Sequence, residues 1–200
     1  MIAVIDYKAG NLTSVVKALT ALGADARVTE DPAVVRAAER VVLPGVGHFA
    51  ATERLRDSGI EEAAREVIAA GVPFLGICVG LQWLFEGSTE APALRGLGAL
   101  PGLCERFPDT CKVPHVGWNT LEPVQGSRLL AGISAQSFVY YTHSYRAPVV
   151  NETVGATEYA GRFSGAVERG NLFGVQFHPE KSGDTGLQIL RNFLAVERSC

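Results

Sequence analysis

The chain has 200 residues, of which 47% are hydrophobic and 20% charged, enough to bury one sizeable core, and no Ser-, Pro- or Gly-rich linker divides it. We therefore expect a single domain over residues 1–200. The net charge of −3 and a pI near 5.8, without a cluster of Lys and Arg, argue against nucleic acid or an anionic membrane as the main partner.

The cysteines indicate a reducing compartment. They are irregularly spaced and form no C-x-x-C pair, unlike a disulfide framework, and they lie at Cys78, Cys104, Cys111 and Cys200. The spacing of Cys104, Cys111 and His115 matches no common zinc pattern, so we expect neither a metal nor a cofactor. The chain opens with a strand pattern and lacks both a signal-peptide pattern and an apolar run that could cross a bilayer. A cytoplasmic protein is the expectation.

In the first half of the chain, predicted strands alternate with predicted helices. Short apolar runs predict strands at residues 2–5, 26–29, 41–43 and 74–77. Apolar residues spaced by three and four predict helices at residues 12–22, 32–38, 49–56 and 60–70. This order predicts an α/β fold with a doubly wound, mostly parallel central sheet flanked by helices. Ligands bind such sheets beyond the carboxyl ends of the strands, where we expect Asp6, Gly45 and Cys78.

From Leu97 onward the pattern changes to short β-type runs broken by Gly, Pro and Asn. They predict additional short antiparallel strands at residues 103–107, 113–121, 137–145, 153–157, 165–168 and 172–177. A final helix is predicted over residues 185–196, with Asp184 as its N-cap. Its apolar spacing predicts that Leu187, Leu190 and Leu194 face the core.

The stretch from Val72 to Glu86 predicts a strand, a sharp turn and a helix, with Cys78 at the turn. Gly76 and Gly80 flank the cysteine in a G-x-C-x-G frame, the thiol counterpart of the G-x-S-x-G nucleophile elbow. We expect the sulfur to be exposed at a helix N-terminus, where free N–H groups and the helix dipole favour the thiolate. The alternative is a buried cysteine that serves as a small apolar core residue.

A thiol nucleophile requires a base to take and return its proton, and the base requires a third group to fix its orientation. His178 and Glu180 follow directly on a predicted strand and would fill these two roles. A histidine near a strand end is, by itself, more often a surface or capping residue. Together with the elbow, the pattern predicts a Cys78, His178 and Glu180 triad.

Acyl transfer also requires hydrogen-bond donors for the developing oxyanion. The backbone N–H groups of the turn that contains Gly45 and Gly47 are candidates, as is the N–H of Val79, which follows the nucleophile. The alternative for the Pro44–Gly47 segment is an ordinary turn at the end of a strand. Gln82, one helical turn after Cys78, would face a substrate or else lie in solvent.

Taken together, these segments resemble a known protein family. The Gly76–Gln82 segment, with Pro44–Gly47 before it and His178–Glu180 after it, resembles the class I (triad) glutamine amidotransferases. Within that family, the Lys112–Asn119, Tyr141–Tyr145 and His178–Ser182 segments resemble the glutaminase subunits of imidazole glycerol phosphate synthases. The run Pro-His-Val-Gly-Trp-Asn is more specific than the triad.

The resemblance covers nearly the whole chain, from Asp6-Tyr7 to Lys181. Lys8 departs from the pattern, because the family often has Gly at this position. The departure leaves the triad intact but leaves open how the Gly10-Asn11 loop is positioned.

The resemblance implies the flavodoxin-like fold of class I glutamine amidotransferases and the hydrolysis of glutamine. Cys78 would attack the side-chain amide, His178 would transfer the proton, Glu180 would orient His178, and water would hydrolyse the resulting thioester. The ammonia would pass to a (β/α)₈-barrel cyclase subunit in a heterodimer, which forms imidazole glycerol phosphate in histidine biosynthesis.

The resemblance also implies two groups of binding residues. Those near glutamine would be Gly45, Gly47, Val79, Gln82, His143, Ser144 and Tyr145. Those toward the cyclase partner would be Pro114, His115, Trp118, Asn119, Tyr141 and Lys181. Without the resemblance, Trp118 is interpreted as a buried anchor and Lys181 as a solvated charge.

Two alternatives remain. Another glutaminase subunit, such as that of pyridoxal phosphate synthase, shares the triad but is expected to lack the Pro-His-Val-Gly-Trp-Asn run. A non-enzymatic, flavodoxin-like redox sensor would oxidise an elbow cysteine without a base, and the His178-Pro179-Glu180 turn argues against it. Glutamate release from glutamine, with and without the cyclase, would separate the three.

Overall fold

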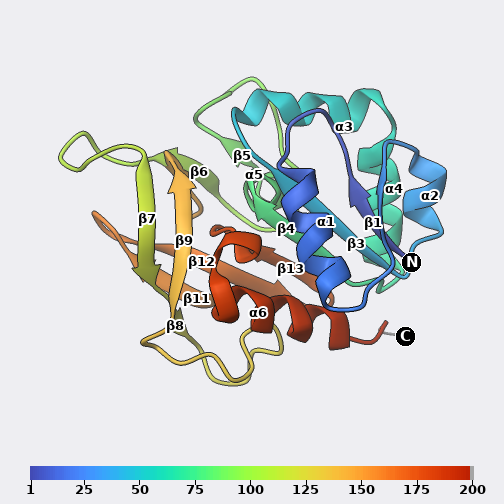
Figure 1. Ribbon diagram of the computed structural model, residues 1–200. Helices are drawn as coiled ribbons and strands as arrows, with labels where there is room; N and C mark the ends of the chain where they lie inside the picture. The colour runs from blue at the N-terminus through green and yellow to red at the C-terminus, as the bar shows by residue number, and fades with distance from the viewer. Residues whose placement is uncertain (199–200) are drawn as a thin grey trace.

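The computed structural model describes residues 1–198, so Cys200 lies outside the described residues (Figure 1). An eight-stranded sheet with the order β2-β1-β3-β4-β13-β12-β11-β8 forms its centre. The strands from β2 to β13 pair in parallel, and β12, β11 and β8 continue the sheet in antiparallel pairing. The strands are β1 (Ile2–Ile5), β2 (Ala26–Thr29), β3 (Arg40–Gly45), β4 (Phe74–Cys78), β8 (Glu122–Pro123), β11 (Thr153–Glu158), β12 (Arg162–Arg169) and β13 (Leu172–Val175).

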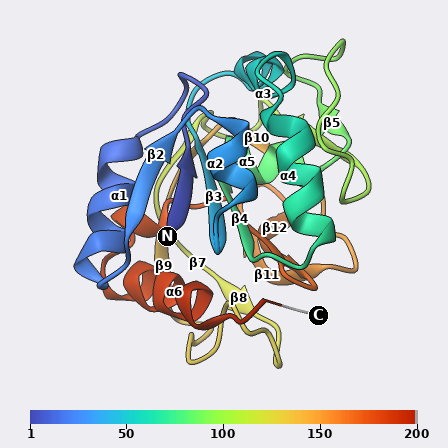
Figure 2. The same cartoon turned by 90° about the vertical axis from the view of Figure 1, so that its right-hand side faces the viewer.

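Helices cover both faces of this sheet. Helices α1 (Leu12–Ala21) and α6 (Gly183–Ala195) lie on one face, while α2 (Pro32–Arg36) and α4 (Ile60–Ala69) lie on the other (Figure 2). Every residue of β1, β4 and β13 is buried, which explains why these strands read as unbroken apolar runs. The predicted doubly wound α/β fold is confirmed. No helix within residues 1–198 is long and apolar enough to span a membrane.

Two smaller sheets pack beside the central one. Strands β5 (Gly87–Ser88), β6 (Leu103–Arg106) and β10 (Tyr145–Arg146) form a three-stranded sheet. Strands β7 (His115–Thr120) and β9 (Phe138–His143) pair antiparallel, and we call this pair the β7–β9 ribbon. The short antiparallel strands predicted in the C-terminal half are therefore present.

Several predicted boundaries change. Strand β3 continues through Pro44 and Gly45, because both pair with the end of β4. The segment predicted as a helix over residues 49–56 is a 3₁₀ turn, η1 (Phe49–Thr52), followed by α3 (Glu53–Asp57). The helix after Cys78 is the short α5 (Val79–Leu84).

The last helix differs from the prediction at its start. Helix α6 begins at Gly183, so the residue in the N-cap position is Ser182 and not Asp184. The Ser182 side chain does not cap the helix, because its hydroxyl donates to the carbonyl of His178 at 2.7 Å and accepts from the Tyr140 N–H at 2.9 Å. This hydroxyl fixes the η2 turn (Pro179–Lys181) against β9.

The core-facing residues of α6 are also different. Leu190 is buried as predicted, whereas Leu187 and Leu194 are only half-buried. The stripe toward the core is formed by Ile189, Leu190 and Phe193. The helix is therefore rotated by about one residue from the predicted orientation.

Candidate active site

The elbow around Cys78 has the predicted strand-turn-helix form. Strand β4 ends at Cys78, and α5 begins at the next residue. Cys78 has φ 55°, in the positive region that non-glycine residues rarely adopt. A Cβ on Gly80 would lie 1.9 Å from the Leu43 carbonyl oxygen, and one on Gly76 would lie 2.5 Å from the Gly80 oxygen. Both glycines are required by the close approach of neighbouring backbone.

The expectation that Cys78 is exposed is wrong. The residue is only 3% exposed, because the chain on both sides of the elbow packs around it. It reaches solvent through a cavity of about 250 Å³ at the carboxyl end of β4. We call this the Cys78 cavity, and its lining residues are Val46, Gly47, Cys78, Val79, Gln82, Glu90, Pro114, Thr142, His143, Ser144 and Tyr145.

His178 and Glu180 form a buried pair after β13, the strand adjacent to β4. The Nδ1 atom of His178 lies 2.9 Å from Oε1 of Glu180, and both side chains are almost fully buried. A carboxylate oxygen accepts, so Nδ1 carries a proton. The buried Nε2 atom makes no hydrogen bond of good geometry within residues 1–198. That nitrogen is left for the thiol of Cys78.

The pKa of His178 reflects this position. Burial alone would lower it, but the neighbouring Cys78 and the hydrogen bond with Glu180 outweigh burial and raise the pKa of His178 to about 9. The imidazole is therefore protonated at neutral pH, beside the cysteine sulfur. This arrangement provides a nucleophile, a proton carrier and an orienting carboxylate.

The turn after β3 lies beside the elbow. Gly45 pairs with Cys78 in the sheet, and Val46 and Gly47 line the cavity. The N–H of Val46 donates to the carbonyl of Ala9 at 3.2 Å, so it is not available to an oxyanion in this conformation. The N–H of Val79 belongs to the first residue of α5. The structure thus brings the expected donor residues together, with the Val46 amide already bound.

The loop that holds the Val46 amide contains Lys8, where the family often has Gly. Lys8 adopts the left-handed conformation, with φ 65°, and its N–H donates to Oδ1 of Asp6 at 2.7 Å. Its ammonium pairs with Asp6 and Glu30. A lysine therefore adopts the conformation that glycine tolerates best, and the carboxylates around it hold the loop in place.

The glutamine-binding residues expected from the resemblance lie around the same cavity. His143, Ser144 and Tyr145 line it, as does Gln82. The alternative that Gln82 is solvated is wrong, because it is 2% exposed and its Nε2 donates to the Tyr145 carbonyl at 2.9 Å. Glu90 also lines the cavity, and its Oε2 accepts from the Phe49 N–H at 2.7 Å. Sequence reasoning missed Glu90, since its spacing from Cys78 matches no motif that we recognised.

Two residues expected at a partner interface are buried instead. His115 is 4% exposed and Tyr141 is inaccessible, so neither can touch a partner in this structure. Nδ1 of His115 lies 3.0 Å from Nε2 of His143, and Nδ1 of His143 lies 2.9 Å from the Tyr145 carbonyl oxygen. Because a carbonyl only accepts, His143 donates from Nδ1 and accepts from His115. Burial lowers the pKa of His115 to about 4 and that of His143 to about 3, so both are neutral.

The other face of the β7–β9 ribbon is open. Trp118 is 55% exposed, so its interpretation as a buried anchor is wrong. It packs edge-on against Tyr140, which in turn lies under the ammonium of Lys181. Pro114 and Lys181 are also exposed, whereas Asn119 is half-buried and donates to the Glu158 carbonyl. Sequence reasoning missed Tyr140, although the alternation along β9 placed it opposite Tyr141.

Strand β9 is hydrogen-bonded directly to the turn that carries His178 and Glu180. The N–H of His178 donates to the carbonyl of Tyr140 at 2.9 Å, next to the bond between Ser182 and the Tyr140 N–H. A shift of β9 would therefore move the imidazole. Strand β9 thus forms part of the open face and is also hydrogen-bonded to the backbone of the candidate base.

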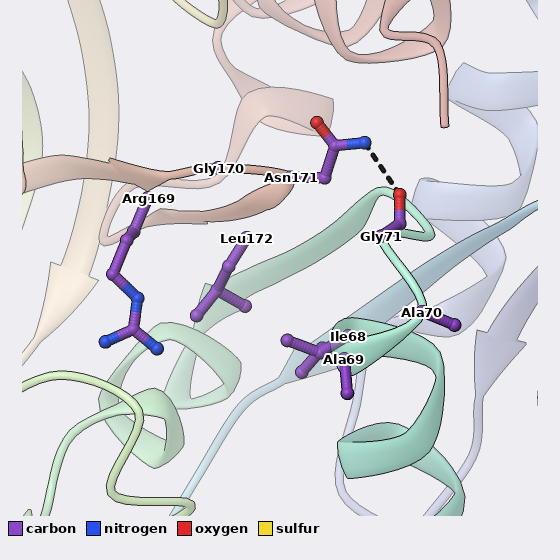
Figure 3. Close-up of a pocket in the computed structure, with 8 residues that line it drawn as sticks. All are labelled: Ile68, Ala69, Ala70, Gly71, Arg169, Gly170, Asn171 and Leu172. Carbon is purple, nitrogen blue, oxygen red and sulfur yellow. Dashed lines mark hydrogen bonds between the residues drawn. The ribbon is translucent and has the colours of Figure 1, made fainter. Parts of the chain in front are cut away.

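A larger cavity, of about 510 Å³, lies at the amino ends of β4 and β13, away from Cys78 (Figure 3). Its wall combines apolar side chains, such as Ile68 and Leu172, with the polar side chains of Arg169 and Asn171. The Nδ2 atom of Asn171 donates to the Gly71 carbonyl at 2.7 Å, so this polar side chain is already satisfied (Figure 3). Within residues 1–198, no three His, Cys, Asp or Glu residues cluster in a way that could hold a metal ion. The chemistry is concentrated in the Cys78 cavity.

Comparison with known proteins is consistent with this geometry. The family described as glutamine amidotransferase class-I matches residues 3–196. The imidazole glycerol phosphate synthase subunit HisH of Moorella thermoacetica is 50% identical over 195 residues, 96% of this chain and 93% of that protein. HisH of Methanothermobacter thermautotrophicus is 46% identical over the full length of both chains. A crystal structure of a glutamine amidotransferase has the same fold, with a TM-score of 0.77 at 19% identity, over 98% of this chain and 100% of that one.

Proposed function

The chain belongs to the class I glutamine amidotransferase family, and we propose that it is the glutaminase subunit of an imidazole glycerol phosphate synthase, acting in histidine biosynthesis. We propose that residues 1–200 form one amidotransferase domain. The observation that carries the activity is the buried Cys78, His178 and Glu180 arrangement at the ends of two adjacent parallel strands. We assign its catalysis to side chains and backbone N–H groups of the protein, without a metal or a cofactor.

The proposed reaction proceeds through a thioester. The Cys78 sulfur attacks the side-chain carbonyl carbon of glutamine, and the protonated His178 gives its proton to the departing nitrogen, which leaves as ammonia. Water then attacks the thioester while His178 accepts a proton, and glutamate leaves as the thiolate returns. Glu180 keeps Nδ1 of His178 protonated, so that Nε2 remains the reactive nitrogen throughout.

The Cys78 cavity is suited to a small polar substrate. Glu90 supplies a carboxylate on the cavity wall, which would attract the α-ammonium group of glutamine. Gln82, His143, Ser144 and Tyr145 line the adjacent wall. The N–H groups of Val79 and of the Gly45–Gly47 turn would receive the oxyanion.

The bond between Val46 and Ala9 has a kinetic consequence. An amide that already donates to a carbonyl cannot stabilise an oxyanion, so the free chain should hydrolyse glutamine slowly. We propose that the partner speeds the reaction by shifting the turn to a conformation in which this amide is released. A glutaminase that stays slow until it is partnered does not waste ammonia.

The outer face of the β7–β9 ribbon is the proposed docking surface for the cyclase. Val116, Trp118 and Phe138 are each more than half exposed on this one face, which is costly for a chain without a partner. This face adjoins the Cys78 cavity, because Pro114, just before β7, and Thr142, on β9, line that cavity. We propose a (β/α)₈-barrel cyclase as the occupant, with Trp118 as an aromatic anchor and Lys181 as a charge partner. A cytoplasmic location suits this pathway and agrees with the free thiols of Cys78, Cys104 and Cys111.

The test measures glutamate release by the purified chain, alone and with the cyclase subunit. We expect slow release from the free chain and faster release from the complex, with imidazole glycerol phosphate formed at a matching rate. Activation by a pyridoxal phosphate synthase subunit instead would support the other glutaminase. No glutamate release in any mixture would contradict the proposal.

A further inference from the structure

Gln176 lies between β13 and the catalytic turn, and the proposed mechanism gives it no role. It is completely buried. Its Nε2 atom lies 3.7 Å from the sulfur of Cys78, within hydrogen-bond range for sulfur, and its Oε1 atom lies 3.3 Å from Nε2 of Gln82. A polar side chain is thus placed against the reacting atom from the same strand that leads to His178.

The direction of these bonds follows from one backbone carbonyl. The Tyr145 oxygen can only accept, so the group of Gln82 that lies 2.9 Å from it must be the NH₂. The same NH₂ meets Gln176, which must therefore present its oxygen to Gln82. The NH₂ of Gln176 is left facing the sulfur. The orientation of both amides is fixed by the hydrogen-bond network.

The backbone holds this donor in a constant position. The N–H of Gln176 donates to the Gly165 carbonyl of β12 at 2.9 Å. Gln176 and His178 both follow β13 and are separated by one residue in a bent stretch of the chain. The same short segment therefore supplies the amide beside the sulfur and the imidazole of the candidate base.

We propose that Gln176 is a further catalytic residue, whose amide N–H donates to the Cys78 sulfur and stabilises the thiolate before attack, with Gln82 setting its direction. A hydrogen bond to an ionised group is about twice as strong as one between neutral groups, so the donor favours thiolate over thiol. When the sulfur becomes part of a neutral thioester, this bond weakens. The assignment deepens the proposed function, but the contact between donor and sulfur does not depend on which substrate is bound.

Alkylation of Cys78 by iodoacetamide provides the test. The thiolate attacks the CH₂ carbon, a carbon–sulfur bond forms and iodide leaves, so the rate follows the thiolate fraction. Site-resolved mass spectrometry separates Cys78 from the other cysteines. The other titratable groups near the sulfur or on the wall of its cavity are His178, Tyr7, Glu90, His143 and Tyr145, and they are unchanged in every variant. The variants are Gln176→Leu, which removes the donor, and Gln176→Glu, in which Gln82 can still donate to a carboxyl oxygen.

The matched control is Thr157→Val. Thr157 is buried, like Gln176, and its hydroxyl bonds to Tyr141 and to the Thr120 carbonyl, away from the sulfur. Its loss removes buried hydrogen bonds and lowers the melting temperature, as the loss of Gln176 does. A purely structural role for Gln176 would therefore give the same alkylation profile as the control.

In Gln176→Leu, we expect the pH midpoint of alkylation to rise by about one unit, so that alkylation below the midpoint is about tenfold slower than in the wild type. In Gln176→Glu, the midpoint should rise by more. The acid limb of kcat/KM for glutamine should move in the same direction. Midpoints equal to that of Thr157→Val would overturn the proposal. If both variants unfold, the NMR resonances of the Gln176 side-chain NH₂ in the wild-type protein provide the test. They should shift with pH as the Cys78 thiolate forms. Resonances that do not shift would contradict the hydrogen bond from Gln176 to the sulfur.

If glutamine is not the substrate, glutamate release is absent in all proteins while the alkylation shift remains. That result would contradict the proposed function and leave the role of Gln176 supported. The reverse result, normal glutamine hydrolysis with unshifted alkylation, would contradict the role of Gln176 alone.

Discussion

The paired strands β4 and β13 and the β7–β9 ribbon contrast in how they bury their side chains. Every residue of β4 and β13 is buried, and at or beyond their carboxyl ends buried polar side chains appear at Cys78, Gln176 and His178. The ribbon is buried on one face, with His115 and His143 inside, and open on the other. In a fully buried region, a polar side chain indicates a site of chemistry. An apolar face that is exposed to solvent indicates a surface for a partner.

The two regions are connected through Tyr140. Its carbonyl accepts from the N–H of His178, and its N–H donates to the Ser182 hydroxyl, close to the Glu180 carboxylate. A displacement of the open face can therefore be transmitted through β9 to His178. Substitutions should separate the regions: those at the strand ends should remove catalysis, and those in the ribbon should affect activation and stability.

Among substitutions that keep the nucleophile, the largest effect is expected at the orienting carboxylate. Glu180→Gln removes the charge that accepts from His178, and we expect kcat to fall by about 10³- to 10⁴-fold. The pH profile provides a second measurement, since the wild-type rate should fall above about pH 9, where His178 loses the proton that ammonia requires. This limb should move to lower pH in the variant. A variant with the wild-type rate and profile would mean that another carboxylate orients the base.

On the open face of the ribbon, the expected effect is on association. Trp118→Ala should weaken cyclase binding by about 30-fold, the scale of an aromatic anchor worth 2 kcal/mol. Titration calorimetry and the activation of glutamate release measure the change. Val28→Ala is the control, because Val28 is also about half exposed (48%) but lies on β2, at the opposite edge of the sheet. If Trp118→Ala and Val28→Ala bound the cyclase equally well, the ribbon would not be part of the interface.

The buried face of the ribbon should make the protein sensitive to acid. The pKa values of His115 and His143, about 4 and about 3, lie below the ordinary value of 6.5. Below pH 6.5 the unfolded chain therefore binds protons that the folded protein does not. The free energy of unfolding should fall by up to about 1.4 kcal/mol per pH unit for each histidine, down to about pH 4.

Urea unfolding at pH 6, 5.5 and 5 measures this slope, below the range in which the raised pKa of His178, about 9, contributes in the opposite direction. His115→Gln should reduce the slope, because this histidine is one of the two that stay neutral in the folded protein. Unfolding free energies that do not change over this range would mean that the two histidines are protonated in the folded state.

The smallest effect is expected at Lys8, where the chain departs from its family. Lys8→Gly relieves the left-handed backbone but loses two exposed ion pairs, so the net change in stability should be small. Lys8→Ala loses the ion pairs but keeps the strain, so it should be the less stable of the two in thermal unfolding. An alanine variant as stable as the glycine variant would indicate that the backbone at this position is unstrained.

The sequence predicts the parallel half of the fold and the elbow at Cys78 well, for a physical reason. Strands buried on both faces leave unbroken apolar runs, and the elbow leaves paired glycines around Cys78 that the close backbone approach requires. The orientation of the ribbon is harder to predict from the sequence, because both of its faces carry aromatic residues. Alternation separates Tyr140 from Tyr141 but does not decide which one packs inward; that depends on the neighbouring strands. Glu90 and Gln176 were missed because only the folded chain brings them to the sulfur.

The central claim is that ammonia is made at Cys78 and consumed in a partner. The decisive measurement follows glutamate release and imidazole glycerol phosphate formation together, for the complex that contains Cys78→Ala, first with glutamine and then with ammonium as the nitrogen source. We expect glutamine-dependent synthesis and glutamate release to disappear, and ammonium-dependent synthesis to continue at close to the wild-type rate, because the cyclase chemistry needs no residue of this chain. Glutamine turnover near the wild-type rate, or loss of ammonium-driven synthesis in a complex that still assembles, would contradict this division of labour.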